Sequence, residues 1–244
     1  MRQGIPYRPE IDGLRCVAVV SVVLFHSGLG VANGGYVGVD IFFVISGYLI
    51  TSIILTEVDN REFSYLAFYE RRIRRLVPAL LVMLATTWLF ASALLESGAY
   101  QEFTLSLLSV IGGLANWFFY FQSGYFDAPS QDKMLLHLWS LGVEEQFYIF
   151  FPFFLFALVK FQSRRRLVVG VAVLAATSFI YSVVLVAGEE FDKAFYDTVA
   201  RAWELLAGAF LAIGISPPAE PARSPRCTLP GCNGYRVRCF RIRQ

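Results

Sequence analysis

Long apolar runs without a charged residue constrain this chain more than any other feature of its sequence. Four uncharged stretches cover residues 16–39, 76–95, 103–126 and 167–188. Each is long enough to cross the hydrocarbon core of a bilayer as a helix, which takes roughly 20 residues. The first run is also longer than the apolar region of a signal peptide, so we read it as a membrane span and not as a cleaved leader.

The overall composition points the same way. Charged residues make up 16% of the chain, whereas soluble domains carry about 25%. Three shorter apolar runs can reach spanning length by extending past a flanking charge. We therefore predict an all-α, polytopic membrane helix bundle of about seven apolar segments, near residues 15–31, 36–56, 76–95, 103–121, 136–159, 167–187 and 197–215.

The charge is unevenly distributed, which divides the chain into two parts. Residues 1–215 hold 15 basic and 18 acidic side chains, whereas 216–244 hold six arginines and one glutamate. The first part, a membrane domain, is thus not a nucleic-acid binder by charge. The second part is a basic tail without helical or strand periodicity, so we expect it to be disordered. Its cysteines match no zinc-binding spacing, and we predict no metal site.

The distribution of arginines predicts how the chain is oriented. Arginines precede the first apolar segment, and positive residues favour the cytoplasmic side of a membrane, so we expect a cytoplasmic N-terminus. Residues 57–75 end in four arginines within five positions. We expect this stretch to be a cytoplasmic loop that ends in a short interfacial helix, followed by a separate third span from about residue 76.

The later segments conflict with this rule. If every segment crosses fully, the basic cluster at 164–166 lies outside, against the tendency for positive residues to stay inside. Either one segment does not cross completely, or the tendency fails here. The segment at 103–121 contains Gly112, Gly113 and Asn116, which makes it the best candidate for a broken or re-entrant segment. Such breaks are tolerated where they are buried or line a cavity.

Ionisable residues inside membrane spans are expensive and are therefore functional candidates. Arg15 and His26 are eleven positions apart, which places them on one helix face with an axial separation of about 16 Å. A neutral His26 near mid-membrane can accept a proton from an acceptor hydroxyl. An equally good reading from these two residues alone is a single hydrogen bond between helices.

Arg72 and Arg75 are three positions apart and share a helix face. Arginine forks bind phosphate in a bidentate manner, which suits a phosphate-rich donor such as acyl-CoA. Taken alone, however, the pair is better explained as an ordinary cytoplasmic basic cluster. Glu144 and Glu145 begin an apolar segment, where they can favour the helix dipole or pair with these arginines.

Two further charged positions lie within apolar segments. Asp40 interrupts the second segment and can orient or charge-pair a partner. Arg201 and Glu204 form an i, i+3 pair at the head of the last segment.

Five stretches, in this order along the chain, resemble the acyltransferase family 3 membrane proteins. That family includes O-acetyltransferases of bacterial O-antigen, peptidoglycan and other surface glycans. The stretches are IDGLR (11–15) with His26, GVDIFFVISG (38–47), FYERRIRRLVP (68–78), WSLGVEEQFY (139–148) and RAWELLAG (201–208).

The resemblance implies a membrane O-acetyltransferase of the bacterial inner membrane. Such an enzyme has no bound cofactor and transfers acetyl from acetyl-CoA to a hydroxyl of a cell-surface polysaccharide or lipid-linked sugar. It implies that His26 is the essential histidine and Arg15 its partner, and that Arg72 and Arg75 bind the donor. The supporting residues would be Asp40, Glu144, Glu145, Arg201 and Glu204.

The expected partners are membrane lipid, a glycan acceptor and the acetyl-CoA donor, with no nucleic acid and an open oligomeric state. Two other functions stay in consideration. A membrane transporter also has ionisable residues inside its membrane spans. Transporters often show internal sequence repeats, however, and we see no such repeat in this sequence. The second is a non-catalytic, truncated remnant. Family members usually have more spans than this chain, so we expect its membrane domain to be incomplete.

Overall fold

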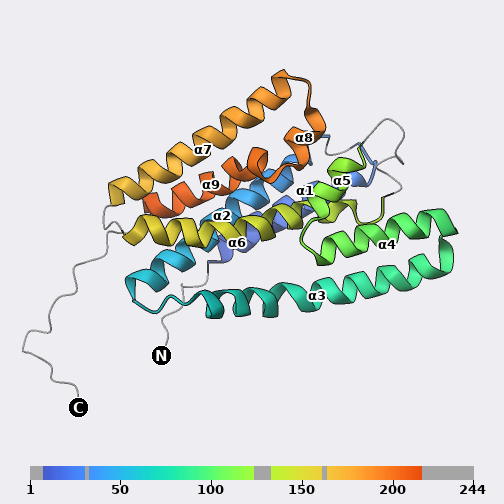
Figure 1. Cartoon of the computed structure of the whole chain (residues 1–244), viewed down its shortest axis with the longest axis horizontal. Helices are drawn as coiled ribbons and strands as arrows, with labels where there is room; N and C mark the ends of the chain where they lie inside the picture. The colour runs from blue at the N-terminus through green and yellow to red at the C-terminus, as the bar shows by residue number, and fades with distance from the viewer. Residues whose placement is uncertain (1–7, 31–32, 124–132, 161–163, 216–244) are drawn as a thin grey trace, which may run out of the picture.

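The computed structural model describes residues 8–30, 33–123, 133–160 and 164–215, and within these residues the chain is helical without a strand. The predicted disordered tail at 216–244 lies outside the described residues. Figure 1 shows an elongated bundle of helices, which confirms the predicted all-α class. The elements are α1 (Pro9–His26), α2 (Val37–Asp59), α3 (Tyr65–Leu94), α4 (Ser97–Ile111), α5 (Ala115–Phe121), the 3₁₀ turn η2 (Leu136–Leu138), α6 (Trp139–Lys160), α7 (Arg164–Ala187), α8 (Phe191–Tyr196) and α9 (Thr198–Ile215).

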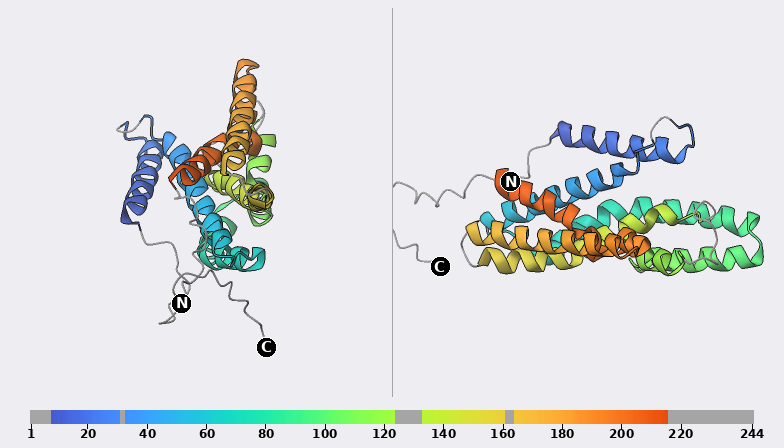
Figure 2. Two further views of the ribbon diagram at one scale, coloured as in Figure 1. Left: turned by 90° about the vertical axis from the view of Figure 1, so that its left-hand side faces the viewer. Right: turned by 90° about the horizontal axis from the view of Figure 1, so that it is seen from above.

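Helices α2 and α9 form the tightest contact of the bundle, and α7 packs on α9. Glycines make the approach of α2 and α9 possible. A Cβ built on Gly47 would lie 1.8 Å from the carbonyl oxygen of Leu205, and one on Gly208 would lie 1.9 Å from that of Val44. Small residues of this kind let membrane helices pack backbone against backbone. Helix α1 packs on α2 at one side of the bundle (Figure 2).

Helix α3 corrects one prediction. Residues 65–94 form one continuous helix that includes Pro78, so the expected separation of an interfacial helix from the third span is wrong, whereas the third span itself is part of this helix. Proline is tolerated inside membrane helices because neighbouring groups satisfy the freed carbonyl. The helix is about 45 Å long, more than the ~30 Å hydrocarbon core. The four arginines of 71–75 are therefore part of a long helix and do not lie in a loop before it.

The fourth apolar segment is broken, as predicted. Helix α4 ends at Ile111, Gly113 adopts a φ of +67°, and α5 begins at Ala115. Glycine occupies this left-handed backbone conformation at no steric cost. Helices α4 and α5 do not reach the end of the bundle where α3 begins (Figure 1). The segment therefore turns back within the bundle, the arrangement expected of a re-entrant segment.

The break explains the conflict over the second basic cluster. Arg71 forms an ion pair with Glu57 at the end of α2. Arg164, at the start of α7, donates to the carbonyl of Ile213 and interacts with Asp59, the last residue of α2. The basic clusters at 71–75 and 164–166 therefore lie at the same end of the bundle, as the positive-inside tendency requires.

Four stretches are long and apolar enough to cross a membrane: α2, α3, residues 136–158 and α7. Helices α1 and α9 have 18 residues each and are not among them. The chain is thus a multi-pass membrane protein, whereas the predicted number of seven spans is not confirmed.

Candidate functional site

Glu144 lies at the centre of the candidate site. It belongs to α6 and is only 8% exposed. The hydroxyls of Ser46 on α2 and Tyr148 on α6 lie next to its carboxyl group. Its Oε1 atom has no hydrogen-bond partner among the residues that the structure describes. A buried acceptor of this kind is costly unless a ligand or another group completes it.

Two arginines from two other helices lie within electrostatic range of this carboxyl group, and a third, the exposed Arg75 of α3, lies near one of them. Arg15 of α1 and Arg72 of α3 lie close enough to act on the charge of Glu144, and Arg75 is close to Arg15. The Cζ atom of Arg72 lies 3.9 Å from the centroid of the Tyr148 ring. We call Arg15, Arg72, Arg75 and Glu144 the arginine–glutamate cluster. Asp12 also pairs with Arg15, at 3.9 Å. The three cations still outnumber the two carboxylates, so the chemistry of the cluster favours an anionic ligand.

The neighbouring arginines of α3 are in a different environment. Arg71 pairs with Glu57 and Arg74 with Glu70, at 2.6 Å in each case. The Arg74 side chain is 79% exposed, whereas Arg72 is half-buried. The helical repeat therefore directs Arg72 toward α6, while its neighbours are neutralised by acidic partners. Arg72 is thus placed differently from Arg71 and Arg74, whereas Arg75 is exposed.

His26 is the last residue of α1 and lies at the exposed surface of the described residues. Its Nδ1 atom lies 2.9 Å from the carbonyl oxygen of Val22. A carbonyl can only accept a hydrogen bond, so Nδ1 is the donor in this contact, and a neutral ring would keep its lone pair on Nε2. This is the tautomer in which Nε2 can act as a base.

His137 is the residue that the sequence reasoning missed. It lies in η2, close enough to His26 for their charges to interact. Two histidines from segments more than 100 positions apart thus lie near one another. The available signal was that His137 is the only other histidine and stands two residues before the WSLGVEEQFY stretch. Proximity to His26 depends on tertiary packing and could not be read from that signal.

Asp40, Arg201 and Glu204 form a second charged group. Arg201 pairs with Asp40 of α2 at 2.5 Å and with Glu204 at 2.9 Å, so the expected i, i+3 pair is present. The Arg201 guanidinium lies 5.7–5.8 Å from the ring centroids of three aromatic residues: Phe43, Trp139 and Phe195. This group links α2 to α9 inside the bundle.

Glu145 lies apart from the arginine–glutamate cluster. A Cβ on Gly113 would lie 3.1 Å from its Oε2 atom, so this carboxylate faces the break between α4 and α5. Consecutive residues of a helix point about 100° apart, so Glu144 and Glu145 face different neighbours.

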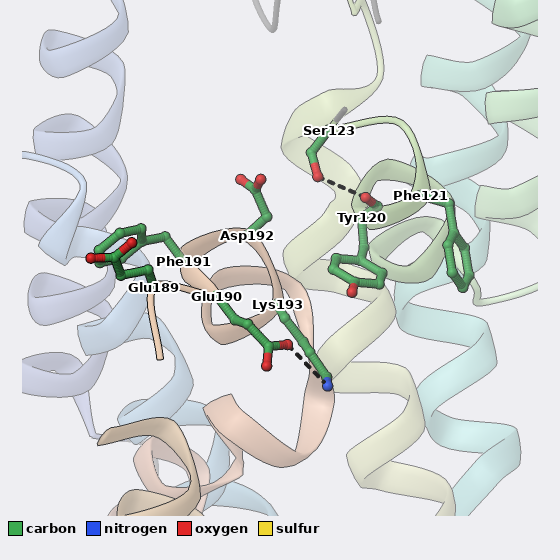
Figure 3. Close-up of a pocket in the computed structure, with 8 residues that line it drawn as sticks. All are labelled: Tyr120, Phe121, Ser123, Glu189, Glu190, Phe191, Asp192 and Lys193. Atoms are coloured by element: carbon green, nitrogen blue, oxygen red, sulfur yellow. Dashed lines mark hydrogen bonds and ion pairs between the residues drawn. The ribbon is translucent and has the colours of Figure 1, made fainter. Parts of the chain in front are cut away.

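The structure also contains a shallow cavity of about 370 Å³ between the end of α5 and the turn from α7 to α8 (Figure 3). Lys193 donates to Glu190 across 3.2 Å at its edge, and this hydrogen bond raises the pKa of the lysine. None of the site residues predicted from the sequence lines this cavity. Its lining residues are Tyr120, Phe121, Ser123, Glu189, Glu190, Phe191, Asp192 and Lys193.

Comparison with known proteins defines the class of this chain. The acyltransferase family 3 profile, described as an acyltransferase domain, matches residues 8–215. The chain therefore belongs to this family of membrane acyltransferases, which confirms the resemblance seen in its motifs. No solved structure matches the chain.

Curated relatives carry more particular names. The chain is 37% identical over 215 residues to the peptidoglycan O-acetyltransferase OatA of Listeria monocytogenes, covering 86% of this chain and 34% of the relative. It is 40% identical over 211 residues to the putative peptidoglycan O-acetyltransferase YrhL of Bacillus subtilis, covering 85% and 33%. A putative O-acetyltransferase of Staphylococcus aureus is 35% identical over 226 residues, covering 90% and 36%. The chain thus aligns with about a third of the length of these relatives.

Proposed function

We propose that this chain is a membrane O-acetyltransferase that transfers an acetyl group from acetyl-CoA to a hydroxyl of a cell-surface glycan of the peptidoglycan class. The observation that carries the proposal is the arginine–glutamate cluster, in which side chains of α1, α3 and α6 converge. The names of the relatives supply the acetyl group and the class of acceptor.

The cluster is the proposed donor site. The phosphates of coenzyme A are anions, and arginine forks bind phosphate with two parallel hydrogen bonds. Arg72 and Arg75 would hold these phosphates, with Arg15 deeper in the bundle. Because the basic clusters share one end of the bundle, we assign that end, and with it the N-terminus, to the cytoplasm of the inner membrane.

His26 is the proposed base. With Nδ1 donating to the Val22 carbonyl, the Nε2 atom of the neutral ring would take the proton from the acceptor hydroxyl as the hydroxyl oxygen attacks the thioester carbonyl. The new C–O bond forms, the C–S bond breaks, and the electron pair leaves with the coenzyme A thiolate. His26 lies about 16 Å along α1 from Arg15, so the donor's extended arm would reach from the arginines toward the histidine.

Acetylation of peptidoglycan tests the proposal. The chain and its His26→Ala variant would be expressed in a bacterium that lacks its own peptidoglycan O-acetyltransferase. Ester-linked acetate, released by mild base from purified peptidoglycan, should rise only with the unchanged chain. Equal acetate from both variants would remove His26 from the mechanism. Acetate from neither, with both proteins present in the membrane, would refute the activity and favour a transporter or a non-catalytic remnant.

A further inference from the structure

A partly buried polar network joins the break between α4 and α5 to the helices of the candidate site. The amide nitrogen of Gln146, on α6, donates to the carbonyl of Gly113 at 2.9 Å and to Oδ1 of Asn116 at 2.8 Å. Thr198, the first residue of α9, donates from Oγ1 to Oε1 of Gln146 at 2.5 Å. One side chain thus contacts three separate segments.

Asn116 completes the network from α5. It is fully buried, and its amide nitrogen donates to the carbonyl of Tyr196 and to Oγ1 of Thr198, at 3.0 Å each. Both amide nitrogens therefore use both of their hydrogens, and the threonine hydroxyl both accepts and donates. An interrupted helix in a membrane must have its free backbone groups satisfied by neighbours. Gln146 provides this at the Gly113 carbonyl.

The position of Gln146 on α6 links this network to the arginine–glutamate cluster. Gln146 follows Glu144 by two residues, so the two side chains point about 200° apart, on opposite faces of the helix. Tyr148 follows Glu144 by four residues and lies on the same face as Glu144. Fixing the Gln146 face by hydrogen bonds therefore fixes the rotation at which α6 presents Glu144 and Tyr148 to the arginines.

We propose that Gln146 is a positioning residue for acetyl transfer. By binding the Gly113 carbonyl, Asn116 and Thr198, it anchors the re-entrant segment on α6 and α9 and orients Glu144 toward Arg15 and Arg72. The functional part rests on the proposed acetyltransferase activity, because the cluster is the donor site of that reaction. Gln146 itself touches neither donor nor acceptor and acts through Glu144.

A double-mutant cycle tests the dependence on Glu144. Gln146→Ala should lower kcat by about 10- to 100-fold, the cost of a small displacement at a reacting centre. The same substitution in a Glu144→Gln background should cause no further loss, because its effect passes through Glu144. Losses that multiply in the double variant would refute the positioning role. The control is Gln101→Ala, an exposed glutamine of α4, which should match the unchanged chain.

The network also predicts a rescue at Thr198. Thr198→Ser keeps the hydroxyl that donates to Gln146 and should keep near-normal turnover. Thr198→Val has the same shape without the hydroxyl and should lose turnover as Gln146→Ala does. Equal effects of serine and valine would exclude a role for the hydrogen bond.

A cross-linking measurement tests the positioning without any need for activity. Cysteines would replace Ser46 and Glu144, which are neighbours in the structure, in a chain whose native cysteines are changed to serine. Oxidation should form the disulfide at a rate that Gln146→Ala lowers and Gln101→Ala leaves unchanged. An unchanged rate with Gln146→Ala would refute the positioning. If the unchanged chain shows no acetyltransferase activity but Gln146→Ala still lowers the cross-linking rate, the positioning of Glu144 stands and only the proposed function is refuted.

Discussion

The guanidinium of Arg72 lies over the aromatic ring of Tyr148, with 3.9 Å between its Cζ atom and the ring centroid. The ring face attracts the cation and covers one side of it. The edge of the guanidinium, which carries its N–H groups, can still bind an anion. Arg72 thus stacks on an uncharged ring as well as lying near Glu144, whereas Arg71 and Arg74 form ion pairs with exposed or half-buried carboxylates.

The first prediction concerns use of the donor. Replacing Arg72 and Arg75 together by alanine should raise the KM for acetyl-CoA by about 10- to 100-fold, the value of one or two charge-assisted hydrogen bonds. Initial rates in membrane vesicles over a range of acetyl-CoA concentrations measure this. Arg74→Ala is the matched control, because this arginine belongs to the same helix but is exposed and paired with Glu70. An unchanged KM in the double variant would remove these arginines from the donor site.

The sequence alone predicted the fold better than it predicted the candidate site. Composition and apolar runs were sufficient to predict the membrane bundle, and Gly112 and Gly113 marked the break in the fourth segment. Grouping Arg15, Arg72 and Glu144 depended on the resemblance to a family, because these residues lie on three helices. The continuity of α3 through its arginines was missed, since a dense basic cluster in a membrane protein usually marks a loop.

Other features were outside the reach of sequence patterns. Gln146 reads as an ordinary polar residue beside two carboxylates, and its role depends on partners at positions 113, 116 and 198. The nearness of His137 to His26 is likewise a consequence of packing. Periodicity gives the face on which a residue lies but not the helix that this face meets.

The second prediction concerns the contact between α2 and α9. Gly208→Ala should destabilise the protein by about 1–3 kcal/mol, as overpacking does, because its new Cβ would lie 1.9 Å from the carbonyl oxygen of Val44. Gly214→Ala, in the same helix, has open space around the new methyl group and should be neutral or slightly stabilising. Thermal unfolding in detergent compares the two. Equal unfolding temperatures would show that α2 and α9 do not pack this closely.

The third prediction concerns the Asp40–Arg201–Glu204 group. Arg201→Met should destabilise by about 3–5 kcal/mol, because it leaves Glu204 as a buried charge without a partner, at only 1% exposure. Adding Glu204→Gln should recover part of this loss, since the amide carries no charge. Lys193→Ala, which breaks an exposed ion pair with Glu190, is the control and should leave the unfolding temperature unchanged. A double variant no more stable than Arg201→Met would contradict the charge explanation.

The fourth prediction concerns the path of the chain through the membrane. Because α4 and α5 turn back, cysteines introduced at Asn60 and Arg165 should both react with a membrane-impermeant thiol reagent from the same side. A cysteine at Glu189, at the far end of α7, should react only from the other side. The native cysteines would be replaced by serine, and labelling of intact cells and of inverted vesicles would be compared.

The two topologies give opposite results at one position. A segment 97–121 that crossed completely would move Arg165 to the side opposite Asn60, and the two cysteines would then label from different sides. Same-side labelling would establish that the re-entrant segment returns to the face from which it entered. Labelling of both from the cytoplasm would also establish the proposed orientation, because the two basic clusters would then lie inside, where positive residues are favoured.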